Sequence, residues 1–218
     1  MIVKIIFSKP ENGMRIDNQH YINGFIHKCL GKNNKYHNSF SDYAISSLQG
    51  GKLCNGRLVF NENPYILVSS ENSNFINDLM AGILTTDGNI EGIKFDRFEF
   101  SDYNVNDYYD KIITLSPILI KDKSGMKLSF KDENFLEVLT NNCIKKLKHA
   151  GITDKSFKIK IRNINKSKVK KIMVGDVFNI CSLISLVVFG KPKTRKTLYN
   201  LGIGNSCGCG FGTIKIYE

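Results

Sequence analysis

The 218-residue sequence predicts an α+β fold made of two consecutive βαββαβ units. Short runs in which apolar and polar residues alternate are typical of strands, and between them apolar residues recur at the three- and four-residue spacing of helices. The resulting order of strand, helix, strand, strand, helix, strand occurs over about residues 1–103 and again over about 110–218. We therefore expect two tandem ferredoxin-like (RRM-like) domains, 1–105 and 106–218.

The first domain is expected to begin with a strand over 2–7, where IVKIIF contains a single lysine. A helix is predicted over 18–31, because its apolar residues form one stripe and Gly31 is a natural stop. His20 and His27 then share the opposite face of this helix. The remaining elements are strands over 57–60, 64–69 and 93–100 and a helix over 72–83 that begins at an Asn or Ser cap.

The second domain is expected to begin with a strand over 111–120. A helix follows over 132–149, because its first turn is acidic and its last turn basic, which is the order that the helix dipole favours. Gly151 ends this helix. The remaining elements are strands over 156–162, 168–174, 177–189 and 211–217 and a short helix over 192–200 with Pro192 in its first turn.

Positive charge is concentrated near the C-terminus. The chain has 31 Lys and Arg against 20 Asp and Glu, a net charge of +11. Residues 141–218 contain 16 of the basic residues and only 3 acidic ones. This asymmetry favours a polyanionic partner, most simply nucleic acid. A solubilising surface in a lysine- and asparagine-rich composition explains the same numbers.

Several classes of protein are not favoured by this sequence. No apolar run reaches the roughly 18–20 residues of a membrane span, and the N-terminus lacks the pattern of a secretory signal. We therefore expect a cytoplasmic protein with no membrane partner. The six cysteines form no Cys-x-x-Cys pair, and Cys207-Gly-Cys209 has no matching His or Cys, so neither a disulfide framework nor a metal or other cofactor is expected.

The most distinctive segment is LGIGNSCGCGFG, residues 201–212, in which five glycines precede the last strand. Such a loop can adopt positive φ angles and expose consecutive backbone N–H groups, which is a nest for phosphate oxygens. It is neither a P-loop nor a dinucleotide fingerprint, because no Gly-Lys-Ser/Thr follows and the loop enters a strand instead of a helix. A tight turn before the strand explains the glycines equally well.

The pair Gly202-Ile203-Gly204 and Gly210-Phe211-Gly212 resembles the glycine-rich loop of the RAMP superfamily, and most of all that of the CRISPR repeat-processing endoribonucleases. The segments 18–26 (NQHYINGFI) and 114–118 (TLSPI) are similar to that family's first helix and to the strand that opens its second domain. The resemblance implies an enzyme that cleaves precursor CRISPR RNA within the repeat without metal. The RNA's own 2′-hydroxyl is the nucleophile, and the products carry a 2′,3′-cyclic phosphate and a 5′-hydroxyl.

The same resemblance implies three catalytic residues. His37 lies in the loop after the first helix, His27 is its partner acid or base on that helix, and Lys52 stands where a lysine of the family approaches the scissile phosphate. Histidine can exchange protons at neutral pH and lysine can stabilise developing negative charge. The alternative interpretation of the histidines is that they are surface residues. The alternative for Lys52 is an ordinary charged residue after a glycine turn.

RNA contacts are expected from the loop and from the basic C-terminal third. Lys168 and Lys170 share one face of their strand, which suits a row of phosphates, although lysines also protect edge strands against aggregation. The expected contacts are Gly202, Gly204, Asn205, Ser206, Gly208, Gly210, Gly212, Lys168, Lys170, Lys171, Lys191, Lys193, Arg195 and Lys196.

The predicted partner is CRISPR repeat RNA. The alternative function is that of a non-catalytic RAMP subunit that holds guide RNA in an effector complex, whose other subunits would then be partners. Either a monomer or a homodimer is compatible with the sequence.

Overall fold

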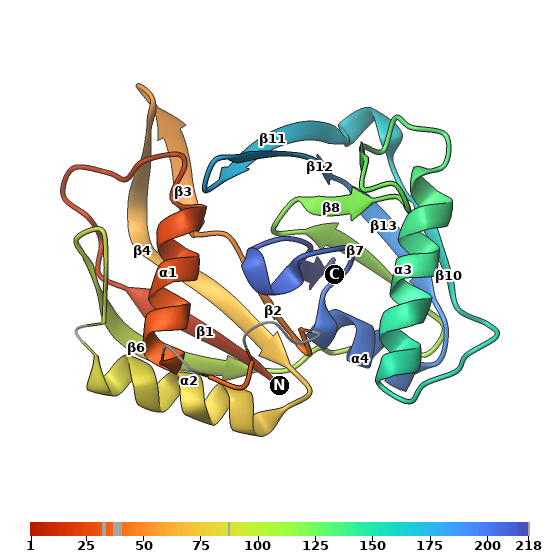
Figure 1. Cartoon of the computed structure of the whole chain (residues 1–218), viewed down its shortest axis with the longest axis horizontal. Coiled ribbons are helices and arrows are strands. Elements are labelled where there is room, and N and C mark those ends of the chain that lie inside the picture. Colours follow the sequence, from red (N-terminus) through yellow and green to blue (C-terminus); the bar gives the residue numbers. More distant parts are fainter. Residues whose placement is uncertain (32–33, 37–40, 87, 218) are drawn as a thin grey trace.

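The computed structural model describes residues 1–31, 34–36, 41–86 and 88–217. Two halves, each with an antiparallel sheet and two helices, lie side by side (Figure 1). This arrangement confirms the α+β fold of two tandem ferredoxin-like units. None of the helices within the described residues has the length and apolarity to cross a membrane.

The first half has the strand order β2-β4-β1-β6-β5, in which β4 and β6 flank the central strand β1. Both helices pack on one face of this sheet, where apolar residues such as Val3, Ile5 and Ile66 meet Ile22 and Phe75. The elements are β1 (Ile2–Phe7), α1 (Gln19–Leu30), β2 (Tyr43–Ile45), β3 (Gln49–Cys54), β4 (Arg57–Ser70), α2 (Ser73–Thr85), β5 (Asn89–Ile90) and β6 (Ile93–Ser101).

The second half repeats this topology with the order β10-β13-β7-β14. A separate four-stranded sheet, β11-β12-β8-β9, is inserted into it, and its β11–β12 hairpin extends toward α1 (Figure 1). The elements are β7 (Tyr109–Thr114), β8 (Ile118–Lys121), β9 (Lys127–Leu128), α3 (Phe135–His149), β10 (Lys158–Ile161), β11 (Lys168–Val174), β12 (Val177–Leu183), β13 (Ser185–Phe189), α4 (Pro192–Leu201) and β14 (Ile214–Ile216).

Four predicted strands were wrong in where they begin or end. The segments 57–60 and 64–69 are one strand, β4, which continues through Pro64 because β3 pairs with its first part and β1 with its second. The segments 111–120 and 177–189 each divide into two strands, because the chain passes from one sheet to the other near Pro117 and Ile184. Apolar residues continue across both transitions since both sheets contribute to the core.

The short helix α4 is fixed by a buried ion pair. Arg195 pairs with Asp110 of β7, and both side chains are fully buried. Arg195 Nε also donates to the Gly190 carbonyl at 3.0 Å, and the Tyr199 hydroxyl donates to Asp110 Oδ2 at 3.0 Å. Arg195 is therefore inaccessible to a phosphate, and the expectation that it contacts RNA is wrong. This guanidinium, one helical turn after Pro192, joins α4 to β7 within the core.

Polar contacts join the two halves. The Ser47 backbone N–H donates to Ser116 Oγ at 2.7 Å, the Ser69 hydroxyl donates to the Asn200 carbonyl at 3.2 Å, and Asn200 Nδ2 donates to Glu71 Oε1 at 2.6 Å. These contacts join β4 and the residues just after β2 and β4 to the loop after β7 and to α4. The proposed boundary between residues 105 and 106 lies in the segment that connects β6 to β7.

Candidate nucleic-acid interface

The glycine-rich loop is wedged between the two halves. A Cβ at Gly202 would lie 2.8 Å from Ala44 Cβ, and one at Gly208 would lie 2.8 Å from the Tyr43 ring. A Cβ at Gly210 would lie 1.9 Å from Gln19 Nε2 of α1. The absence of side chains at these positions therefore lets the loop backbone lie directly against β2 and α1.

The other side of the loop is bound to the second half by its backbone. The Asn205 N–H donates to the Leu119 carbonyl at 2.8 Å, and the Gly212 N–H donates to the Pro117 carbonyl at 3.0 Å. Asn205 Oδ1 accepts a hydrogen bond from the Lys121 N–H at 3.0 Å. These N–H groups are hydrogen-bonded within the protein and are not free for a phosphate. The glycines are accounted for by close packing and by tight turns of the backbone. The surface that remains is the tip, where Ser206 and Cys209 are exposed and Asn205 is half-buried.

A buried lysine supports the start of this loop. Lys146 of α3 is only 7% exposed. Its Nζ donates to the carbonyls of Leu201 and Gly202 at 3.2 and 2.9 Å and lies 2.9 Å from Cys207 Sγ. Sequence analysis missed this role, although Lys146 follows Cys143 by three residues and so lies on the apolar face of its helix.

A side chain of helix α1 is hydrogen-bonded to the loop tip. Asn23 Nδ2 donates to the Cys209 carbonyl at 3.3 Å, and Asn23 Oδ1 accepts from Gln19 Nε2 at 3.2 Å. His27 lies one helical turn beyond Asn23 and is half-buried. The structure thus brings the helix that carries His27 against the glycine-rich loop.

The other predicted catalytic residues are placed differently. His37 lies outside the described residues. Lys52 is exposed on β3, opposite Val59 in the hairpin with β4 that projects beside α1 (Figure 1). Within the part of the chain that the structure describes, no group of three or more His, Cys, Asp or Glu is placed to hold a metal ion.

The predicted basic contacts do not form one continuous patch. Lys168 and Lys170 share one face of β11, whereas Lys171 lies on the opposite face. Lys191 and Lys193 are exposed at the start of α4, on the opposite side of the molecule from β11 (Figure 1). Lys196 forms an ion pair with Asp102. These lysines therefore do not lie in one row on a single face of the molecule.

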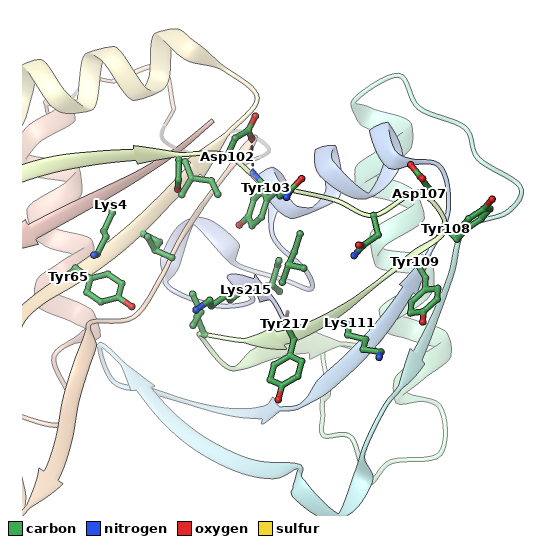
Figure 2. Close-up of a pocket in the computed structure, with 18 residues that line it drawn as sticks. Lys4, Tyr65, Asp102, Tyr103, Asp107, Tyr108, Tyr109, Lys111, Lys215 and Tyr217 are labelled. Atoms are coloured by element: carbon green, nitrogen blue, oxygen red, sulfur yellow. Dashed lines mark hydrogen bonds between the residues drawn. The ribbon is translucent and has the colours of Figure 1, made fainter.

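A groove between the two halves was not predicted. It has a volume of about 830 Å³, and its lining includes five tyrosines and three lysines (Figure 2). Lys4 Nζ lies 4.6 Å from the centre of the Tyr65 ring, and Arg162 lies 5.0 Å from that of Tyr217. The labelled aromatic and basic lining residues are Lys4, Tyr65, Tyr103, Tyr108, Tyr109, Lys111, Lys215 and Tyr217.

Aromatic rings and cations on an open sheet face are typical of surfaces that bind single-stranded nucleic acid. The sequence shows this combination in two places, where Tyr109 precedes Lys111 and Lys215 precedes Tyr217. Residues two apart share a strand face, so each pair sets an aromatic ring beside a cation. Asp102 and Asp107 also line the groove, so its charge is mixed.

Two ferredoxin-like units with a glycine-rich loop wedged between them define the class of tandem RAMP-type proteins. Solved structures share this fold over 100% of the chain. A "CRISPR associated protein Cas6" matches with a TM-score of 0.82 at 20% identity, covering 99% of that chain. "An RAMP protein binding different RNA substrates" matches with 0.85 at 18%, covering 100%. A Cas6-related protein from Pyrococcus furiosus matches with 0.83 at 20%, covering 98%.

The family model described as "CRISPR associated protein Cas6, C-terminal" matches residues 103–216, and the chain belongs to this family. It is also 26% identical, over 165 residues, to the CRISPR-associated endoribonuclease Cas6 1 of Methanocaldococcus jannaschii. That match covers 71% of this chain and 64% of the relative, so the chain spans less than two thirds of the relative's length.

Replacing Lys146 by methionine tests the support of the loop. The substitution keeps much of the aliphatic volume but removes the ammonium donor from two buried carbonyls, so we expect the free energy of unfolding in urea to fall by about 1–3 kcal/mol. Lys145→Met, at the exposed neighbouring position, is the control and should change stability by less than about 0.5 kcal/mol. Equal effects of the two substitutions would contradict the structural role of Lys146.

Proposed function

We propose that this chain is a metal-independent endoribonuclease that cleaves precursor CRISPR RNA within the repeat. The observation that carries the proposal is the attachment of α1, with His27, to the exposed tip of the glycine-rich loop through Asn23. Membership of the Cas6 family supports it. The M. jannaschii relative is itself described as an endoribonuclease, and a structural neighbour is Thermus thermophilus Cse3 bound to an RNA.

The chemistry proposed is attack of the RNA's 2′-oxygen on the adjacent phosphate. The 2′-hydroxyl loses its proton to a base, the bond from phosphorus to the 5′-oxygen breaks, and that oxygen takes up a proton from an acid. The products are a 2′,3′-cyclic phosphate and a 5′-hydroxyl. His27 and His37 are proposed for the two proton transfers and Lys52 for stabilising charge on the phosphorane.

The RNA is proposed to contact three surfaces. The loop tip at Asn205 and Ser206 faces the reacting segment, and the groove between the halves holds unpaired bases by stacking on tyrosines. The exposed lysines of β11 bind phosphates of the same RNA strand. The affinity for RNA should therefore decrease steeply as the salt concentration increases.

Cleavage of a labelled repeat RNA in EDTA tests the proposal. The wild-type protein should cleave, and His37→Ala and His27→Ala should each lower the rate by about 10²-fold or more, because general acid–base catalysis contributes about that much. Binding should be retained, and His149→Ala at the exposed end of α3 is the matched control.

Two outcomes would contradict the enzyme. Tight binding without cleavage by the wild-type protein would favour the alternative, a RAMP subunit that holds guide RNA. Cleavage of an RNA with a 2′-deoxy sugar at the scissile position would contradict the proposed nucleophile.

The groove can be tested independently of cleavage. Tyr65→Ala or Tyr217→Ala should weaken binding of unpaired repeat RNA by about 1–3 kcal/mol in fluorescence anisotropy, the value of one base stacked on an aromatic ring. Tyr65→Phe and Tyr217→Phe keep the ring and should retain most of the affinity. Wild-type affinity in both alanine variants would contradict the proposal that the groove binds RNA.

A further inference from the structure

One glycine has no role that the described part of the fold accounts for. Gly24 lies in the middle of α1 with helical backbone angles and is exposed. A Cβ built on it would meet no atom of the described residues within 4 Å. Glycine is destabilising in a helix interior relative to alanine, so the absence of a side chain here is a cost that nothing in the described structure offsets.

The other glycines have a structural reason. Of the chain's 18 glycines, 14 have positive φ angles, which side chains rarely adopt. The remaining three besides Gly24 are each too close to a neighbour for a Cβ: Gly51 lies against Phe60, Gly82 against the Cys29 carbonyl and Gly208 against Tyr43, all within 3.0 Å. Gly24 is therefore an exception, and the explanation lies outside the described fold.

The helix face around Gly24 is basic. His20 lies one turn before Gly24 and Lys28 one turn after it, and both are exposed. His27 is on the adjoining part of the same face, and α1 contains no acidic residue. An anionic ligand that reached Gly24 would therefore have a cation or a titratable imidazole on each side of it.

This face also adjoins the candidate interface. Asn23, the residue before Gly24, donates to the Cys209 carbonyl at the loop tip. The β11–β12 hairpin, with its lysines, extends toward the same helix (Figure 1). Helix α1 thus neighbours two elements that are expected to contact RNA phosphates.

We propose that the sugar–phosphate backbone of the RNA lies directly against α1 at Gly24, where the missing side chain allows the close approach. His20 and Lys28 flank this contact and bind the phosphates on either side. The inference rests on the proposed function and adds to it the point at which the substrate crosses the helix that carries His27.

Substitution at Gly24 separates this role from folding. Gly24→Ala should raise the midpoint of thermal unfolding by about 2–4 °C, because alanine is the better helix former, and should weaken binding of repeat RNA. Gly24→Leu adds more volume and should weaken binding by about tenfold. Ala81→Leu adds comparable volume to an exposed position of α2 and should leave affinity unchanged.

The outcomes are distinguishable. Wild-type affinity for repeat RNA in Gly24→Leu would overturn the contact at Gly24 and leave the proposed function intact. A lower unfolding midpoint in Gly24→Ala would overturn it too, because the fold itself would then require the glycine. Failure of the wild-type chain to bind repeat RNA would overturn both the contact and the proposed function.

Discussion

The close contact between the glycine-rich loop and the first half of the chain is the constraint on which the rest of the structure depends. The loop backbone lies against Ala44, Tyr43 and Gln19 on one side and is hydrogen-bonded to the β8 region on the other. Side chains at these glycines would separate the surfaces. Lys146 of α3 holds the start of the loop by donating to the carbonyls of Leu201 and Gly202. The loop is therefore a wedge between the two sheets.

This wedge has consequences for function. It fixes α1, and therefore His27, relative to the exposed tip at Asn205 and Ser206, since Asn23 joins the helix to the tip. It also fixes the separation of the two sheets, whose tyrosines and lysines line one groove. A substrate that contacts both halves therefore meets a surface that is already formed, which lowers the ordering cost of binding.

The sequence predicts much of the fold because strand and helix periodicity is local. The strand over 2–7 and the helix near 18–31 are found where the pattern placed them. Sheet membership depends on distant pairing, so the divisions near Pro117 and Ile184 were missed. The burial of Arg195 was missed for the same reason. In the sequence Arg195 belongs to a basic run, but in the fold it pairs with Asp110, which comes from a strand far away in the chain. The groove likewise forms only when the halves come together.

The central claim is that the loop glycines serve packing between the halves, and Gly208→Ala tests it most directly. Gly208 has no positive φ, so the substitution adds only a methyl group 2.8 Å from the Tyr43 ring. We predict that the free energy of unfolding in urea falls by about 1–3 kcal/mol, the usual cost of overpacking. Wild-type stability combined with lost RNA affinity would contradict the claim and restore the interpretation of the loop as a phosphate nest.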